Sequence, residues 1–174
     1  MPKIIENIRE RLLEEAKKQV MELGYSSMTI RSVAGACGVG VGTVYNYFSS
    51  KDMLIAGFML TDWQTSMEKL GAVSAGSDKP QEILECVYRE LRTFIEKYRT
   101  LFQDKRAGQS FAAVFPQRHQ QLRGQIAEHF GKLCRRQKRV DPVFLAEFIA
   151  ENMLTWTMEG RSYEEISGIL LQLM

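Results

Sequence analysis

Long apolar runs, cysteines and prolines are scarce in this sequence of 174 residues, and each scarcity excludes a class of protein. The longest stretch without a polar side chain has only ten residues, Val33–Gly42, whereas a membrane-spanning helix needs about 20. The three cysteines, Cys37, Cys86 and Cys134, form no CxxC pair, which argues against a disulfide framework or a zinc site and fits a reducing cytoplasm. Because the N-terminus carries early charge and no apolar signal core, we expect a cytoplasmic protein rather than a secreted or membrane protein.

Catalytic and metal-binding patterns are also missing. The two histidines, His119 and His129, have no carboxylate or cysteine at ligand spacing, so we expect no metal site. No Ser-His-Asp arrangement or P-loop occurs, and the glycine-rich Gly38–Gly42 follows no predicted strand, so we expect neither an enzyme nor a bound cofactor. The net charge of +2 is too small to identify a nucleic-acid binder by itself, although a local basic patch can exist within a near-neutral total.

Helical spacing of apolar residues is present almost throughout the chain, and long alternation typical of strands is absent. We therefore predict an all-α fold of about nine helices. Their expected ranges are 2–23, 29–36, 40–48, 51–70, 80–98, 100–115, 117–137, 142–159 and 162–174, with a Gly/Ser/Ala-rich linker at 71–79. We expect a DNA-binding domain at residues 1–50 and a second helical domain at 51–174.

Two short helices joined by about three residues with a glycine at the turn are typical of a helix-turn-helix. Gly38 lies at the expected turn, and Ala34 is small where the two helices would cross. Val33, Val39 and Val44 can fill the small core between them. Helices this short need support from the long first helix, so we predict a three-helix unit whose third helix enters the major groove of DNA.

This segment carries a longer and more specific pattern. It reads Thr29-Ile30-Arg31-Ser32-Val33-Ala34, then Gly38-Val39, then Gly42-Thr43-Val44-Tyr45-Asn46-Tyr47-Phe48, Lys51 and Leu54. The string resembles the TetR family of bacterial transcriptional regulators. The resemblance covers the N-terminal third of the chain; the remainder is similar to the family in helix number and length only.

The resemblance implies a set of DNA-contacting residues. They are Thr29, Arg31, Gly40, Val41, Gly42, Thr43, Tyr45, Asn46, Tyr47 and Lys51. Family members use the positions of Thr43, Tyr45 and Tyr47 for phosphate and base contacts, and that of Lys51 for a phosphate. Thr29 and Arg31, at the start of the first short helix, carry groups that suit phosphate binding.

Two positions depart from the family pattern. Many relatives have Ser or Thr at position 40 and a long polar residue at 41, whereas this chain has Gly40 and Val41. Val41 can form no hydrogen bond to a base edge but can contact a thymine methyl group. Arg31, Thr43 and Asn46 would then provide most polar base recognition.

Aromatic residues are abundant in the second domain. Most of them must form the core, but the resemblance implies that some line a pocket for an apolar or aromatic effector. The candidates are Trp63, Phe94, Tyr98, Phe102 and Phe111.

The last two helices carry more apolar residues than one buried stripe needs, which predicts a homodimer formed by a four-helix bundle. The expected interface contains Phe148, Ile149, Met153, Ile166, Ile169 and Leu170. The basic run from Lys132 to Arg139 is interpreted as a solvated helix end, with a second nucleic-acid patch as the alternative.

The leading hypothesis for function is a ligand-responsive repressor that binds a palindromic operator in double-stranded DNA as a homodimer. The alternative is a regulator of the same fold that has no effector and acts through protein partners on DNA. An accessible apolar cavity would favour the first, and a filled core the second.

Overall fold

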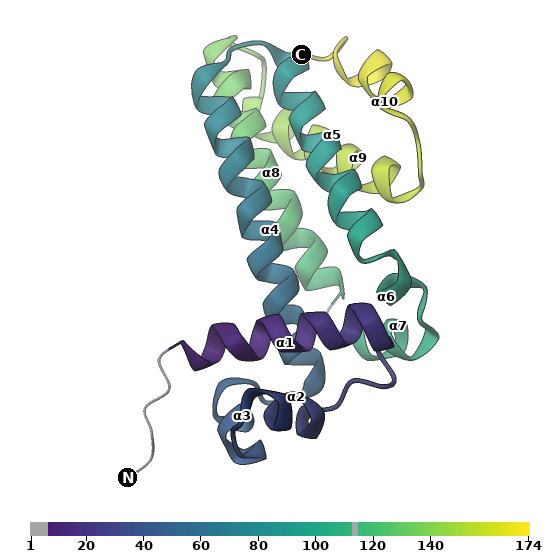
Figure 1. Cartoon of the computed structure of the whole chain (residues 1–174). Helices are drawn as coiled ribbons and strands as arrows, with labels where there is room; N and C mark the ends of the chain where they lie inside the picture. The colour runs from purple at the N-terminus through teal and green to yellow at the C-terminus, as the bar shows by residue number, and fades with distance from the viewer. Residues whose placement is uncertain (1–6, 113–114) are drawn as a thin grey trace. The chain divides into compact units, whose positions relative to one another are not determined.

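The computed structural model describes residues 7–112 and 115–174, and in these ranges the chain is helical without any strand (Figure 1). The predicted all-α fold is confirmed. Residues 2–6 of the first expected helix lie outside the described residues. The described helices are α1 (Ile8–Leu23), α2 (Ile30–Cys37), α3 (Val41–Tyr47), α4 (Lys51–Gly76), α5 (Pro80–Lys97), α6 (Arg99–Gln103), α7 (Lys105–Phe111), α8 (Phe115–Arg136), α9 (Pro142–Met158) and α10 (Tyr163–Leu170). None of the described helices is long and apolar enough to cross a membrane.

The chain divides into two compact units. Unit 1 comprises Met1–Asp62 and Arg99–Ala113, and unit 2 comprises Trp63–Tyr98 and Val114–Met174. The expected boundary near residue 50 thus lies within unit 1, which includes the first part of α4 as well as α6 and α7. An ion pair of 2.7 Å between Lys17 of α1 and Asp62 of α4 joins two helices of this unit.

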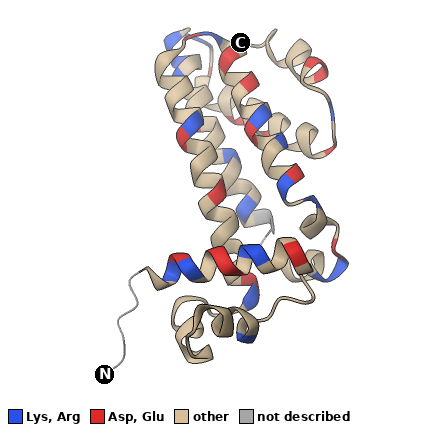
Figure 2. Cartoon of the chain, in the orientation of Figure 1, with Lys and Arg blue, Asp and Glu red and all other residues tan. Residues whose placement is uncertain are grey.

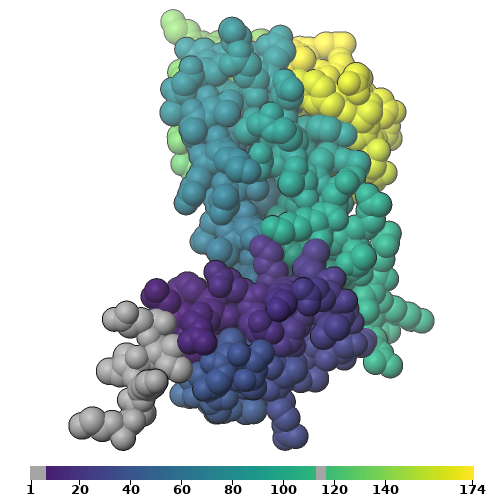
Figure 3. Space-filling view, in the orientation of Figure 1, coloured from purple at the N-terminus to yellow at the C-terminus, as the bar shows by residue number. Residues whose placement is uncertain are grey.

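The core of unit 1 lies where α1 packs against α2, which in turn packs against α3. Leu12 and Val33 are fully buried there. At the surface, Figure 3 shows the purple α1 directly against the blue segment of α2 and α3. Gly57 allows α4 to approach α1 closely, because a Cβ at this position would lie 2.8 Å from Leu13 Cδ2 and 3.1 Å from Phe48 Cε1. A glycine within α4 therefore has a packing reason.

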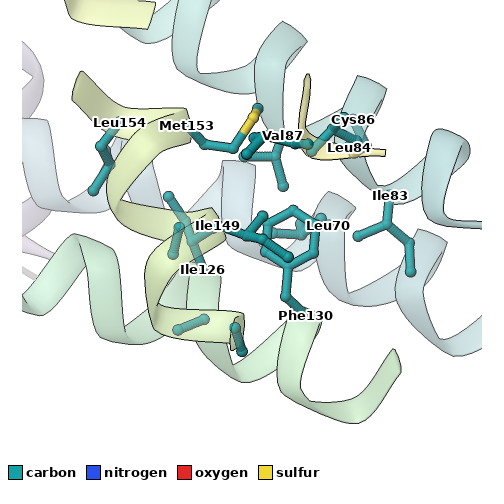
Figure 4. Packing of buried hydrophobic residues seen from close by; sticks show 14 of the residues in the cluster. Leu70, Ile83, Leu84, Cys86, Val87, Ile126, Phe130, Ile149, Met153 and Leu154 are labelled. Carbon is teal, nitrogen blue, oxygen red and sulfur yellow. The ribbon is translucent and has the colours of Figure 1, made fainter. Parts of the chain in front are cut away.

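Unit 2 has a single large hydrophobic core (Figure 4). Phe130 of α8 and Ile149 of α9 lie at its centre, close to Leu70 of α4, and Val87 adds the face of α5. Burial of several such side chains at about 1.5–3 kcal/mol each is the main term that stabilises the bundle.

The expected linker at 71–79 is wrong, because α4 continues to Gly76. Ser74 is buried, and its hydroxyl lies 2.8 Å from His129 Nδ1 and 3.2 Å from the Gly71 carbonyl. Packing against α8 thus overrides the weak helix propensity of this Gly/Ser/Ala segment.

The expected helix at 100–115 is divided into α6 and α7. Asp104 ends the first and caps the second, since its carboxylate accepts hydrogen bonds from the backbone N–H groups of Arg106 and Ala107, both at 2.9 Å. An aspartate cap of this kind starts a new helix rather than continuing the old one.

Candidate nucleic-acid interface

The start of α2 is fixed by a reciprocal cap. The Ser32 N–H donates to Thr29 Oγ1 at 2.9 Å, and the Thr29 N–H donates to Ser32 Oγ at 3.0 Å. The Ser32 hydroxyl also lies 2.6 Å from Gln19 Oε1 of α1. Thr29 therefore caps α2, while its own side chain remains at the surface beside Arg31.

A tight turn joins α2 to α3. Gly38 has φ 68°, a conformation that costs little for glycine, and the Val39 N–H donates to the Ala34 carbonyl at 3.0 Å. Gly40 begins α3 as its N-cap but offers no side-chain hydrogen bond. The Gly40 carbonyl instead accepts from the Thr43 N–H at 2.9 Å, which closes the first turn.

Helix α3 has one buried side and one exposed side. Val44 is fully buried, whereas Tyr45 is 53% and Tyr47 46% exposed. Val41, Gly42 and Asn46 are also exposed, and Thr43 is half-buried. Six of the ten residues expected to contact DNA thus lie on one short helix, and all six are exposed except the half-buried Thr43.

This surface carries little charge. Helix α3 has no Lys, Arg, Asp or Glu, and Figure 2 shows it without a charged segment. Arg31 is the one charged residue in α2 and α3. A helix of this composition can distinguish bases by hydrogen bonds from Thr and Asn and by apolar contact, but it attracts phosphates weakly.

Lys51, the expected phosphate contact, is half-buried at the start of α4. Its ammonium donates to the Tyr25 carbonyl and lies 4.1 Å from the centre of the Tyr25 ring. Burial lowers the pKa of Lys51, and the nearby Asp52 and Asp104 carboxylates oppose that effect. Lys51 is therefore held against the turn between α1 and α2.

Tyr25 is the residue at this site that sequence reasoning missed. Its hydroxyl lies 2.7 Å from Asp52 Oδ1 and 3.0 Å from Ser110 Oγ, and its ring meets Phe111 edge-on at 6.3 Å. A phenol has one proton and a carboxylate only accepts, so the hydroxyl donates to Asp52 and accepts from Ser110. Burial raises the pKa of Tyr25, so the phenol stays neutral. An aromatic residue directly after the helix-ending Gly24 was the available signal.

The five residues expected to line an effector pocket do not share one unit. Trp63, Phe94 and Tyr98 form a packed aromatic row in unit 2, with ring centres 5.5 Å and 4.9 Å apart. Trp63 and Tyr98 are buried, and the Trp63 Nε1–H donates to Gln125 Oε1 at 2.7 Å. Phe102 and Phe111 belong to unit 1, where Phe102 is exposed.

Two surface hollows of unit 2 are lined by other residues. One, of about 510 Å³, follows α5 and the start of α10 and is lined mainly by charged side chains with Tyr88 and Tyr163. The second, of about 430 Å³, lies between α4 and α8. Neither is lined by a member of the expected aromatic set.

The six residues expected at a dimer interface divide into two groups. Four are fully buried within the chain itself and so present no surface: Ile149, Met153, Ile166 and Leu170. Phe148 and Ile169 are 41% and 53% exposed. Phe144, one turn before Phe148, is 66% exposed, and the two rings lie 6.4 Å apart.

The histidines have separate surroundings. His119 Nε2 lies 3.2 Å from Glu151 Oε1, and His129 contacts Ser74. Among the described residues no group of three or more His, Cys, Asp or Glu side chains could hold a metal ion.

The capped α2, the glycine turn and the exposed α3 define a helix-turn-helix protein. Residues 12–57 match the family model described as bacterial regulatory proteins, tetR family. The HTH-type transcriptional regulator UidR of Escherichia coli (strain K12) is 30% identical over 61 residues, which are 35% of this chain and 31% of that protein. The chain thus covers about a third of the length of the curated relatives that it matches.

Solved structures share the whole fold at low identity. Thermus thermophilus FadR, a TetR family transcriptional repressor in complex with lauroyl-CoA, superposes with a TM-score of 0.66 and 23% identity over 95% of this chain and 92% of that one. A TetR/AcrR family regulator from Thermobifida fusca gives 0.60 and 16% over 94% and 96%. Residues 12–57 are thus similar to the tetR family of bacterial regulatory proteins, and the fold of the whole chain is similar to that of these solved structures.

Proposed function

We propose that this protein is a DNA-binding transcriptional regulator that reads the major groove with α3. The observation that carries the proposal is the division of α3 into a buried side at Val44 and an exposed side that includes Tyr45 and Asn46. A recognition helix needs this arrangement, because one side must anchor it while the other meets base edges.

Phosphate contacts would come from the flanks of α3. Arg31 at the start of α2 and Lys51 at the start of α4 are the cations nearest to it in the sequence. Two cations per protomer, or four in a dimer, predict a salt slope of about −3.6. Affinity should then fall about 150-fold between 50 and 200 mM salt. Thr29 and Tyr47 would add uncharged contacts.

We further propose that the protein acts as a homodimer on a palindromic operator and represses transcription. The exposed apolar side chains of α9 and α10, Phe144, Phe148 and Ile169, support self-association, because soluble proteins rarely leave such patches uncovered. A two-fold dimer would place its two α3 helices about 34–36 Å apart, as successive major grooves require. The repressor role is supported by the similarity of the fold to that of FadR, a transcriptional repressor.

Two forms of regulation are considered, and the aromatic row of unit 2 bears on both. A small apolar or aromatic effector is supported by the aromatic row of Trp63, Phe94 and Tyr98, which could separate to admit a ligand, and by the lauroyl-CoA bound in FadR. The second candidate, a regulator without an effector that acts through protein partners, is favoured by the close packing of the same row and the burial of Trp63.

The test is binding of the purified protein to duplex DNA from upstream of its own gene, followed by fluorescence anisotropy across a salt series. Asn46→Ala should change sequence preference. Lys51→Gln should weaken binding to all sequences alike and should reduce the magnitude of the salt slope by roughly 0.9 per protomer. Lys138→Gln removes the same charge from an exposed position of unit 2 and should leave the salt slope unchanged.

Two results would contradict the proposal. One is affinity that hardly changes with salt. The other is a DNA sequence preference that stays unchanged in every variant with a substitution on the exposed side of α3. Repeating the measurement with apolar and aromatic compounds distinguishes the two forms of regulation, since only an effector-responsive protein loses DNA affinity in their presence.

A further inference from the structure

The hollow between α4 and α8 in unit 2 has an unusual combination of linings. It is an open surface hollow with a volume of about 430 Å³. On the α4 side it is lined by small residues and on the α8 side by cations: Gly71, Ser74, Ala75, Lys132, Arg135 and Arg136. Figure 2 shows Lys and Arg gathered near this end of α8.

The three cations share one face of α8. Lys132, Arg135 and Arg136 are spaced i, i+3 and i+4, so their side chains are neighbours on the helix surface. Like charges at this spacing repel one another, which destabilises a helix unless anions lie between them. The hollow is thus a place where positive charge converges.

Carboxylates compensate only part of this charge. Arg136 forms an ion pair with Asp78, and its guanidinium also lies 3.4 Å from the Ser74 carbonyl. Lys132 lies 3.5 Å from Glu128 Oε1 in an exposed pair, which contributes little. Arg135 has no carboxylate partner among the described residues.

The Arg135 guanidinium lies over Gly131, where the absence of a side chain leaves room for it. A Cβ at Gly131 would lie 3.3 Å from Arg135 Nη1, so the side chain runs back over Gly131 along its own helix. On the α4 side of the hollow, Gly71 and Ala75 carry little side-chain bulk, which leaves space opposite Arg135.

Ser74 adds an uncharged polar group to the lining of the hollow. Ser74 is buried, and its hydroxyl pairs with His129 Nδ1 at 2.8 Å. Burial and the charge of Lys132 lower the pKa of His129, so the imidazole is neutral near pH 7. The positive charge at the hollow therefore comes from the three α8 side chains.

We propose that this hollow binds the phosphate group of a small molecule. Guanidinium groups present paired N–H donors that match phosphate oxygens, and Lys132 adds a third cation. A phosphate beside Arg135 would remove the repulsion along α8 and provide the partner that this arginine lacks. The site is separate from the helix-turn-helix residues, so it does not depend on the proposed DNA binding.

Inorganic pyrophosphate is a suitable probe, with calorimetry and thermal unfolding of the full chain at constant ionic strength. We expect saturable binding at millimolar concentrations or below, together with a rise in Tm. Arg135→Gln should weaken binding by about tenfold, the effect of one charge-assisted contact. Arg139→Gln is the matched control, because Arg139 is exposed just beyond α8 and does not line the hollow.

A second variant tests the shape of the site without changing its charge. Ala75→Leu places a larger side chain in the hollow from an exposed position of α4 and should abolish pyrophosphate binding while the protein remains folded. Three results would overturn the proposal. They are no binding to the wild-type protein, equal weakening by Arg139→Gln and Arg135→Gln, and unchanged binding by Ala75→Leu.

Discussion

Replacing Tyr25 by Phe should destabilise unit 1 measurably, although the substitution removes a single oxygen atom. The hydroxyl of Tyr25 joins Asp52 of α4, at 2.7 Å, to Ser110 of α7, at 3.0 Å. A hydrogen bond to a charged group contributes about 1.5–3 kcal/mol and a neutral one about 0.5–1.5 kcal/mol. Asp52 is half-exposed and can regain water in the variant, so we take the lower ends and expect a loss of about 2 kcal/mol.

Urea denaturation followed by circular dichroism measures this loss. With a slope of about 2 kcal/mol per molar urea, the midpoint of unfolding should fall by roughly 1 M. Tyr45→Phe is the matched control, because Tyr45 is 53% exposed on α3 and should show an unchanged midpoint. A Tyr25→Phe midpoint equal to that of Tyr45→Phe would refute the hydrogen-bonded role of Tyr25. In a double-mutant cycle, Tyr25→Phe and Ser110→Ala should be non-additive, since they remove the same bond.

Three further predictions concern packing, protonation and assembly. Gly57→Ala should lower the free energy of unfolding by about 1 kcal/mol in urea titrations, because overpacking of about 2 kcal/mol exceeds the gain of about 1 kcal/mol in helix propensity. Gly35→Ala should instead stabilise the protein, because a Cβ at Gly35 would meet no atom within 4 Å. A change of the same sign in both variants would contradict the argument. Burial and the charge of Lys132 lower the pKa of His129 below the ordinary value of an imidazole, so the unfolded chain binds more protons than the folded one. The free energy of unfolding therefore falls as the pH falls through the range in which His129 titrates. His129→Gln should flatten that dependence between about pH 5 and 7 in urea titrations, whereas an unaltered slope would show that another group titrates. Phe148→Glu should convert the proposed dimer to monomers in sedimentation at micromolar concentration, and a persistent dimer would mean that the interface lies elsewhere.

Local chemistry made the helix-turn-helix predictable. Thr29 before a short apolar run indicates a capped helix, and Gly38 indicates the turn after it; both have these roles in the structure. The burial of Val33 and Val44 follows from the same pattern. Such signals act within a few residues, so the sequence alone contains them.

Long-range packing could not be predicted in the same way. The helix continues through Gly71–Gly76 because Ser74 meets His129, which lies 55 residues further along the chain. The apolar excess of α9 and α10 was recognised, but Ile149 and Ile166 are buried within the protomer while Phe148 is exposed. Spacing shows that a helix has two apolar sides, yet the choice of side depends on the neighbouring helices.

The distribution of charge around α3 has a consequence for the proposed function. Helix α3 itself has no charge, so the electrostatic part of DNA affinity falls to the flanking cations Arg31 and Lys51. Base recognition by α3 and affinity from its flanks are then carried by different residues and can be altered separately. Lys51 is positioned by Tyr25, whose hydroxyl is in turn held by Asp52 and Ser110. A substitution as far along the chain as Ser110 should therefore weaken binding to all DNA sequences alike, through the position of Lys51, and leave sequence preference unchanged.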